Sequence, residues 1–198
     1  ETPNMDIFVT ISQHDNKLIL NSNKDLEKYY HEMTDTLLQS LPDDEAKKLM
    51  RRKGFIAAFL YSDDALREFF HSYTKRYNNT IFIITGDHSL NFYSSNPLSA
   101  YHVPLIIWSP FLEKPQRFQS VVSHNDIAPS LNALLRENFN IKTPEYVHWI
   151  SDGLDTTQSF RSDVKTCFMT QTNISTKLVF NDLYYSEEAG EKKLYRIK

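Results

Sequence analysis

The sequence predicts an α/β fold, with a mostly parallel sheet flanked by helices and a C-terminal antiparallel meander of strands. Short β-branched and aliphatic runs alternate with long amphipathic stretches, which is the pattern of a parallel sheet covered on both faces. After about residue 155 the runs become half-polar and are spaced like hairpins. We therefore expect a main α/β region over residues 1–155 and strands packed on it over residues 156–198.

The composition is that of a folded globular protein. Of the 198 residues, 40% are hydrophobic and 13% aromatic, which is enough for a sizeable core. The formal net charge is −3 and the positive residues are scattered, so no basic face suits nucleic acid. The single cysteine, Cys167, excludes an internal disulfide and is expected to be buried. Since no apolar run reaches the roughly 20 residues of a membrane helix, we expect a soluble chain.

The N-terminal elements are predicted from hydrophobic spacing. A β-branched run over residues 6–12 predicts the first strand. Two amphipathic stretches follow, over residues 24–39 and 44–77, and their apolar residues recur at helical spacing. Gly54 is the point at which the second helix is expected to be interrupted.

Two further strands and a helix are predicted in the second half of the chain. The apolar runs over residues 80–85 and 103–108 are typical of buried strands. A helix is expected to start at Ser123, because polar capping residues stand there and Pro129 falls in the first turn. The tail then offers short strands, the last two joined by a Gly-containing turn.

A carboxylate and an imidazole, Asp87 and His88, stand side by side where the second predicted strand ends. In open α/β sheets, ligands bind beyond the carboxyl ends of the strands, where the loops diverge. Turn chemistry alone would explain a Gly-Asp pair. However, His14 follows the first strand, His102 precedes the third, and His124 precedes the last helix, so we expect several polar groups to converge on one rim.

Each member of this set also has an ordinary explanation. His14 could be a loop residue, and His102 could simply cap a strand. Asp126 lies at the start of the last helix, where a capping role is expected.

The residue types on this rim suit a hard or borderline divalent metal. Carboxylate and imidazole ligands without thiolates suit zinc or manganese, acting as a Lewis acid on a phosphoryl or sulfuryl oxygen. Asp87 and His88 supply two ligands, whereas a complete site needs about three or four. The others are expected either from the same rim or from outside this chain.

Other chemistries lack their motifs. With four glycines in the chain, there is no dinucleotide-binding, phosphate-cradling or nucleophile-elbow motif. Ser89 adjoins His88, but adjacent side chains on an extended exit point apart, which disfavours Ser89 as a nucleophile activated by His88.

Five segments in this order resemble the C-terminal half of the catalytic domain in the sulfatase branch of the alkaline phosphatase superfamily. They are "ISQHDNK", "FLYSDDALREFF", "NNTIFIITGDHSL", "AYHVPLIIWSP" and "VVSHNDIAPSLNALL". Within that branch the resemblance is nearest to lipoteichoic acid synthases, phosphoglycerol transferases and phosphoethanolamine transferases. It covers roughly residues 6–155 and implies a partial domain of the alkaline phosphatase-like fold.

The resemblance implies roles for the rim residues. Asp87 and His88 match the metal-binding pair of the family. His14 matches a histidine that faces the substrate phosphate, and His102 matches another on the substrate side of the site. His124 and Asp126 match a signature with a mostly architectural role near the site.

The nucleophile of the family matches nothing in this chain. It is a threonine in the transferases, or a formylglycine made within the C-x-P-x-R signature in the sulfatases, and it belongs to the N-terminal half. That signature is absent here, and Cys167 lies far into the tail. We therefore expect the chain to be a piece of a longer protein, to need the missing N-terminal half as its partner, and to be inactive alone.

Several functions stay open at this point. The first is a metal-dependent phosphoryl transferase or hydrolase that uses zinc or manganese. The second is a sulfate-ester hydrolase that uses calcium. Atypical residues next to His14 and His88 also allow a non-catalytic module with a decayed site. The substrate would be a phosphate or sulfate ester, lipid- or glycan-linked in some relatives, and the resemblance implies an extracytoplasmic domain, periplasmic or at the cell surface, of a membrane-anchored protein.

Overall fold

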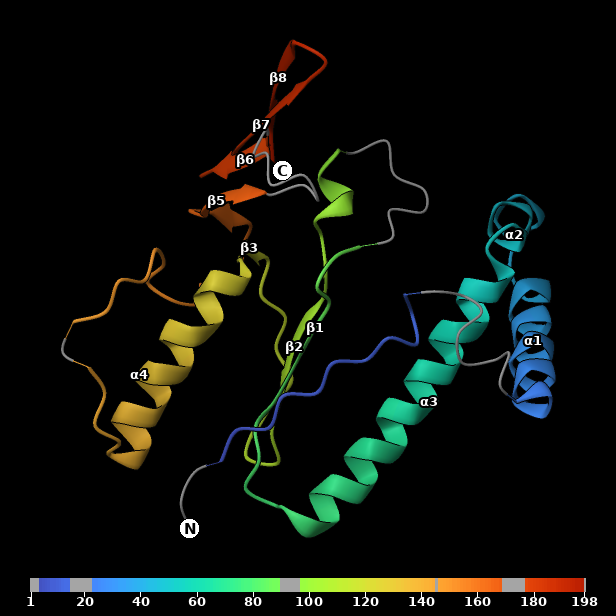
Figure 1. Ribbon diagram of the computed structural model, residues 1–198, viewed down its shortest axis with the longest axis horizontal. Helices are drawn as coiled ribbons and strands as arrows, with labels where there is room; N and C mark the ends of the chain where they lie inside the picture. Colours follow the sequence, from blue (N-terminus) through green and yellow to red (C-terminus); the bar gives the residue numbers. More distant parts are fainter. Residues whose placement is uncertain (1–3, 15–22, 90–96, 145, 169–176, 198) are drawn as a thin grey trace. The chain divides into compact units, whose positions relative to one another are not determined.

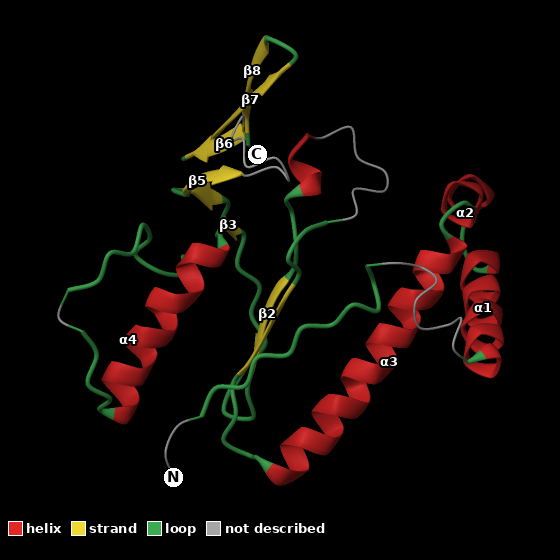
Figure 2. Cartoon of the chain, viewed as in Figure 1, coloured by secondary structure: helices red, strands yellow, loops and turns green. Residues whose placement is uncertain are grey.

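The computed structural model describes residues 4–14, 23–89, 97–144, 146–168 and 177–197, in two compact units. The first unit is Glu1–Ile81 and the second is Phe82–Lys198. Figure 1 labels the elements, and Figure 2 shows that the helices dominate the first unit while the strands lie in the second. Over these stretches no helix combines the length and apolar character needed to cross a bilayer.

The described part of the first unit contains three helices, namely α1 (Lys24–Gln39), α2 (Asp43–Met50) and α3 (Lys53–Arg76). The side chain of Asn23 caps α1 by accepting hydrogen bonds from the amides of Asp25 and Leu26. The bounds of α1 agree with the prediction. The predicted helix over residues 44–77 is divided by a turn at Arg51 and Arg52, just before Gly54, which lies in the first turn of α3.

Helices α1 and α3 pack antiparallel around a small core. Lys53 pairs with Asp35 at 2.6 Å, while the Tyr30 hydroxyl donates to Asp64 Oδ2 at 3.1 Å. The first contact joins the end of α1 to the start of α3, and the second joins the middle of α1 to the middle of α3. The two helices therefore run in opposite directions. The core is formed by Tyr30 and Ala57, with Leu26, Met33, Leu60 and Tyr61 packed against them.

The predicted strand over residues 6–12 is not formed. Residues 4–11 have no strand pairing, and the described part of the first unit contains no other strand to which they could bond. The segment contacts α3 through side chains instead. The Tyr73 hydroxyl donates to Asp6 Oδ2 at 2.9 Å, and the rings of Phe8 and Phe69 meet edge to face at 5.1 Å.

The second unit opens with the strand pair β1 (Phe82–Thr85) and β2 (Leu105–Trp108). The two strands pair antiparallel, with Thr85 opposite Leu105, whereas the apolar pattern predicted parallel neighbours. A parallel pair needs a crossover, usually a helix. The described part of the link between them contains only the single 3-10 turn η2 (Pro97–Ala100), so the chain returns as a wide hairpin.

Parallel pairing occurs between two short strands further along. Strand β3 (Ser120–Val121) pairs in parallel with β4 (Arg161–Ser162). The connection between them contains the 3-10 turn η3 (His124–Asp126) and helix α4 (Ile127–Phe139). Helix α4 confirms the helix predicted after Ser123.

The tail is the predicted antiparallel meander. Strands β5 (Lys165–Phe168), β6 (Lys177–Phe180), β7 (Leu183–Glu188) and β8 (Glu191–Arg196) pair in sequence order. Val179 and Tyr184 stand opposite each other and are buried. Cys167 is exposed on β5, so the prediction that it is buried is wrong. It stands opposite Leu178, on the other face of the sheet from the buried Val179 and Tyr184. Part of the predicted run after Cys167, residues 169–176, lies outside the described residues.

These elements make a mixed α/β chain with a small parallel sheet and a C-terminal antiparallel meander, as the fold class predicted. The predicted division between residues 155 and 156 stays a prediction.

Candidate functional site

Asp87 and His88 lie at the exit of β1, where both side chains face solvent. The Asp87 side chain is 89% exposed and that of His88 is 54% exposed. Asp87 Oδ1 accepts the backbone N–H of His88 at 2.9 Å, which leaves Oδ2 at 3.8 Å from His88 Nε2. The carboxylate and the imidazole therefore present an oxygen and a nitrogen to the same small region.

The antiparallel pairing brings the residues before β2 to this same end of the sheet. Ser89 donates its backbone N–H to the Ala100 carbonyl at 3.3 Å, and His102 donates its own to Ser99 at 3.4 Å. A Cβ on Gly86 would lie 3.2 Å from Val103 Cγ1, so the two chains run close together here. In a parallel pair, a residue before β2 would lie at the opposite end, so the change of direction is what brings His102 to the exit of β1.

His124 reaches the same end from the turn before α4. Its Nε2 lies 3.1 Å from Thr85 Oγ1, and Thr85 is the last residue of β1. Ser123 and Asp126 form a capping box around this turn, which confirms the capping role predicted for Asp126. Asp126 is 7% exposed, and its carboxylate accepts hydrogen bonds from Ser123 N–H and the Ser151 hydroxyl.

His14 belongs to the first unit. It lies in a turn and donates its backbone N–H to the Ile11 carbonyl at 3.1 Å. Because Asp87, His88 and His102 belong to the second unit, their sharing of one rim with His14 stays a prediction.

The Asp87–His88 pair fits two positions of a metal ligand set. Zinc bonds to carboxylate oxygen and imidazole nitrogen are about 2.0–2.2 Å long, so small side-chain rotations would let one ion bridge the 3.8 Å gap. Among the residues that the structure describes, no group of three or more His, Cys, Asp or Glu side chains is placed to hold a metal. These two residues could therefore bind a metal as part of a larger set.

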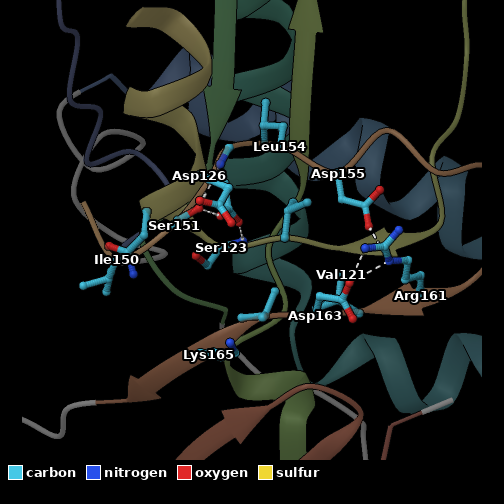
Figure 3. A pocket seen from close by; sticks show the side chains of 15 residues that line it. Val121, Ser123, Asp126, Ile150, Ser151, Leu154, Asp155, Arg161, Asp163 and Lys165 are labelled. Carbon is cyan, nitrogen blue, oxygen red and sulfur yellow. Dashed lines mark hydrogen bonds and ion pairs between the residues drawn. The ribbon is translucent and has the colours of Figure 1, made fainter. Parts of the chain in front are cut away.

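A cavity of about 360 Å³ lies at the start of α4, beneath the segment over residues 150–155 (Figure 3). Sequence reasoning did not anticipate it, although the polar "SDGLD" run was a signal. Ser130 Oγ donates to the Asp126 carbonyl at 2.9 Å and accepts from Leu154 N–H at 2.7 Å. Together with the Ser151–Asp126 contact, these bonds tie the segment to the helix start.

Three charged residues that line this cavity, Asp155, Arg161 and Asp163, contact one another. Arg161 Nε lies 3.4 Å from Asp155 Oδ2 and donates to Asp163 Oδ2 at 2.7 Å, and the bond to Asp163 raises the pKa of Arg161 (Figure 3). The pKa of Asp155 is lowered, first by the Thr157 hydroxyl and then by its backbone N–H and the charge of Arg161. This arrangement holds the loop and β4 together, which is a structural role.

The comparisons with known proteins identify the family. The family model named Sulfatase matches residues 1–136, which is more than half of the 198 residues and includes all six candidate site residues. No curated protein and no solved structure matches the chain significantly. The chain therefore belongs to the sulfatase family, a family of enzymes within the alkaline phosphatase superfamily.

Proposed function

We propose that this chain is the C-terminal part of the catalytic domain of a metal-dependent phosphoryl transferase or hydrolase, of the phosphoglycerol or phosphoethanolamine transferase type. The observation that supports it is the exit of β1, where Asp87 and His88 lie exposed and adjacent, at the same end of the strand pair as His102. The family match adds that this exit belongs to a sulfatase-type domain. The carboxylate oxygen and the imidazole nitrogen are both ligands that zinc and manganese accept.

Each residue has a distinct role in this proposal. Asp87 and His88 hold a zinc or manganese ion, which supplies Lewis-acid chemistry at a phosphoryl oxygen when bound. His102 and His14 contact the phosphate of the substrate through their ring nitrogens. The attacking hydroxyl, a threonine in such transferases, comes from sequence outside this chain, and the domain works at the outer side of a membrane on a phosphate ester that can be lipid- or glycan-linked.

Turnover by the full-length protein that contains this chain tests the proposal. With bis-p-nitrophenyl phosphate we expect activity that a chelator removes and that zinc or manganese restores. Asp87→Ala and His88→Ala should each lower kcat/KM by at least about 100-fold, because each removes a metal ligand. His148→Ala, at an exposed histidine, is the matched control and should leave kcat/KM unchanged.

Two comparisons separate the alternatives. The 198-residue chain alone should hydrolyse neither bis-p-nitrophenyl phosphate nor p-nitrophenyl sulfate. Metal-dependent turnover by this chain would refute the claim that the nucleophile lies outside it. Turnover of p-nitrophenyl sulfate alone would favour a calcium-dependent sulfatase, and an inert full-length protein would favour a non-catalytic module.

A further inference from the structure

The exit of β1 carries two exposed side chains that packing cannot orient. Asp87 and His88 are 89% and 54% exposed. Asp87 Oδ1 accepts the His88 N–H at 2.9 Å and His88 Nδ1 lies 3.4 Å from the Ser89 carbonyl, so the directions of both side chains follow the local backbone. A metal binds more tightly when both donors are held in position before the ion arrives. The question is therefore which contacts fix the backbone of residues 86–89.

We propose that His124 is a positioning residue that fixes the exit of β1 through Thr85 and so sets the direction of Asp87 and His88. The inference rests on the proposed function for its use, although the contact itself does not. His124 Nε2 lies 3.1 Å from Thr85 Oγ1, and that hydroxyl donates to the Gly86 carbonyl at 3.3 Å. A short chain of hydrogen bonds thus ends on the carbonyl directly before Asp87.

The order of donors in this chain assigns the imidazole tautomer. A threonine hydroxyl has one proton, and here that proton is directed to the Gly86 carbonyl. With that direction of the hydroxyl proton, we assign Thr85 Oγ1 as the acceptor from His124 and place the proton of His124 on Nε2. The geometry makes the tautomer a testable part of the inference.

The far side of the exit has its own anchor. Ser89 N–H donates to the Ala100 carbonyl at 3.3 Å, and Gly86 lies against Val103. Asp87 and His88 are therefore held between two attachments, one to the turn before β2 and one to His124. Removing the second attachment loosens the segment at its Thr85 end, where the pairing of Thr85 with Leu105 still holds the strand.

Hydrogen bonds hold the turn that carries His124. It belongs to η3, where Ser123 and Asp126 form the capping box, and the buried Asp126 carboxylate also accepts from Ser151. This arrangement explains the order of residues in "SHND": the cap fixes the turn, and the histidine between its two members reaches across to β1.

Four variants of the 198-residue chain test the inference, with circular dichroism melting as the check on folding. His124→Ala and Thr85→Val remove the bond. His124→Gln places an amide N–H near the position of Nε2, and Thr85→Ser keeps the hydroxyl, so both are matched controls. Hydrogen exchange at the Ser89 amide, measured by NMR without metal, is the readout. We expect the first two variants to exchange about three- to tenfold faster, as the loss of one hydrogen bond predicts, and the controls to stay within about twofold of the parent chain.

Two further readouts make the outcome unambiguous. Nitrogen-15 shifts of the His124 ring should show the Nε2–H tautomer, and the apparent zinc affinity sensed at His88 should fall severalfold in His124→Ala but not in His124→Gln. Unchanged Ser89 exchange in His124→Ala and Thr85→Val would overturn the inference. An Nδ1–H tautomer would overturn the assigned donor order, because the Thr85 hydroxyl would then donate to His124 Nε2. A parent chain in which zinc leaves the His88 ring unperturbed would count against the proposed function, while the exchange rates would still decide the role of His124.

Discussion

Tyr30 places a hydroxyl in the apolar contact between α1 and α3. The residue is 6% exposed, and its donor is satisfied by Asp64 Oδ2 at 3.1 Å. Burial, followed by the hydrogen bond and charge of Asp64, raises the pKa of Tyr30 to about 12. One long-range polar pair thus joins two helices whose core is otherwise small.

Removing this hydroxyl should weaken the first unit. Tyr30→Phe is expected to cost about 1 kcal/mol of unfolding free energy, because Asp64 loses a hydrogen-bond donor. Denaturant unfolding at neutral pH measures the loss. Tyr29→Phe, at an exposed neighbour, is the control, and an equal loss there would contradict the role of the Asp64 bond.

The same bond predicts a pH window. The folded pKa of about 12 lies above the unfolded value of 10.0, so the stabilisation is fully present below pH 10 and is lost as the pH rises through 12. Unfolding measured between pH 9 and about 12 should therefore show a decline that Tyr30→Phe lacks.

At the scale of elements, local rules predicted what local residues decide. The bounds of α1 and the capping role of Asp126 follow from side chains within a few positions of each helix start. The direction of the β1–β2 pair depends on how the link between the strands folds, which no short-range signal specifies. The strand expected over residues 6–12 is not formed, for a related reason: a β-branched run becomes a strand only where a neighbouring strand pairs with it.

The segment over residues 150–155 contains Gly153, at a position where a larger residue would be strained. Gly153 has φ 117°, a conformation that L side chains rarely adopt, and a Cβ there would lie 2.9 Å from Ser130 Oγ. Ser130 already bonds the Asp126 carbonyl and the Leu154 amide, so its hydroxyl cannot move away without breaking those bonds.

Gly153→Ala should therefore destabilise the second unit by about 2 kcal/mol, from backbone strain and the lost Ser130 bonds. Gly190→Ala is the matched control, since Gly190 also has positive φ but an added Cβ would meet nothing within 4 Å. It should cost about 1 kcal/mol. Equal losses in thermal unfolding of the two variants would show that the contact with Ser130 is unimportant.

At the scale of the whole molecule, strand β2 is more exposed to solvent than its sequence predicted. Ile106 and Ile107 are 52% and 41% exposed, although the run that contains them reads as a buried strand. An apolar run suits a strand that is buried on both faces. Here β2 is exposed because it pairs only with β1 in a sheet of two strands. Sequence patterns therefore predicted the two strands but not the exposure of β2, and the site at the end of β1 stays a candidate.

The candidate site divides in the same way. Asp87 and His88 could be found from their position at a strand end, and His102 joins them because of a pairing direction that was not expected. The contact between His124 and Thr85 joins residues 39 positions apart, and no spacing in the sequence signals it.

The central claim is that Asp87 and His88 are two ligands of one divalent metal ion. Calorimetric titration of the 198-residue chain with Zn²⁺ at neutral pH tests it most directly, with His148→Ala as the control. An incomplete ligand set predicts one site with a Kd of about 1 µM or weaker, lost in both Asp87→Ala and His88→Ala and kept in the control. Tight stoichiometric binding that survives Asp87→Ala, or no binding by the parent chain, would contradict the claim.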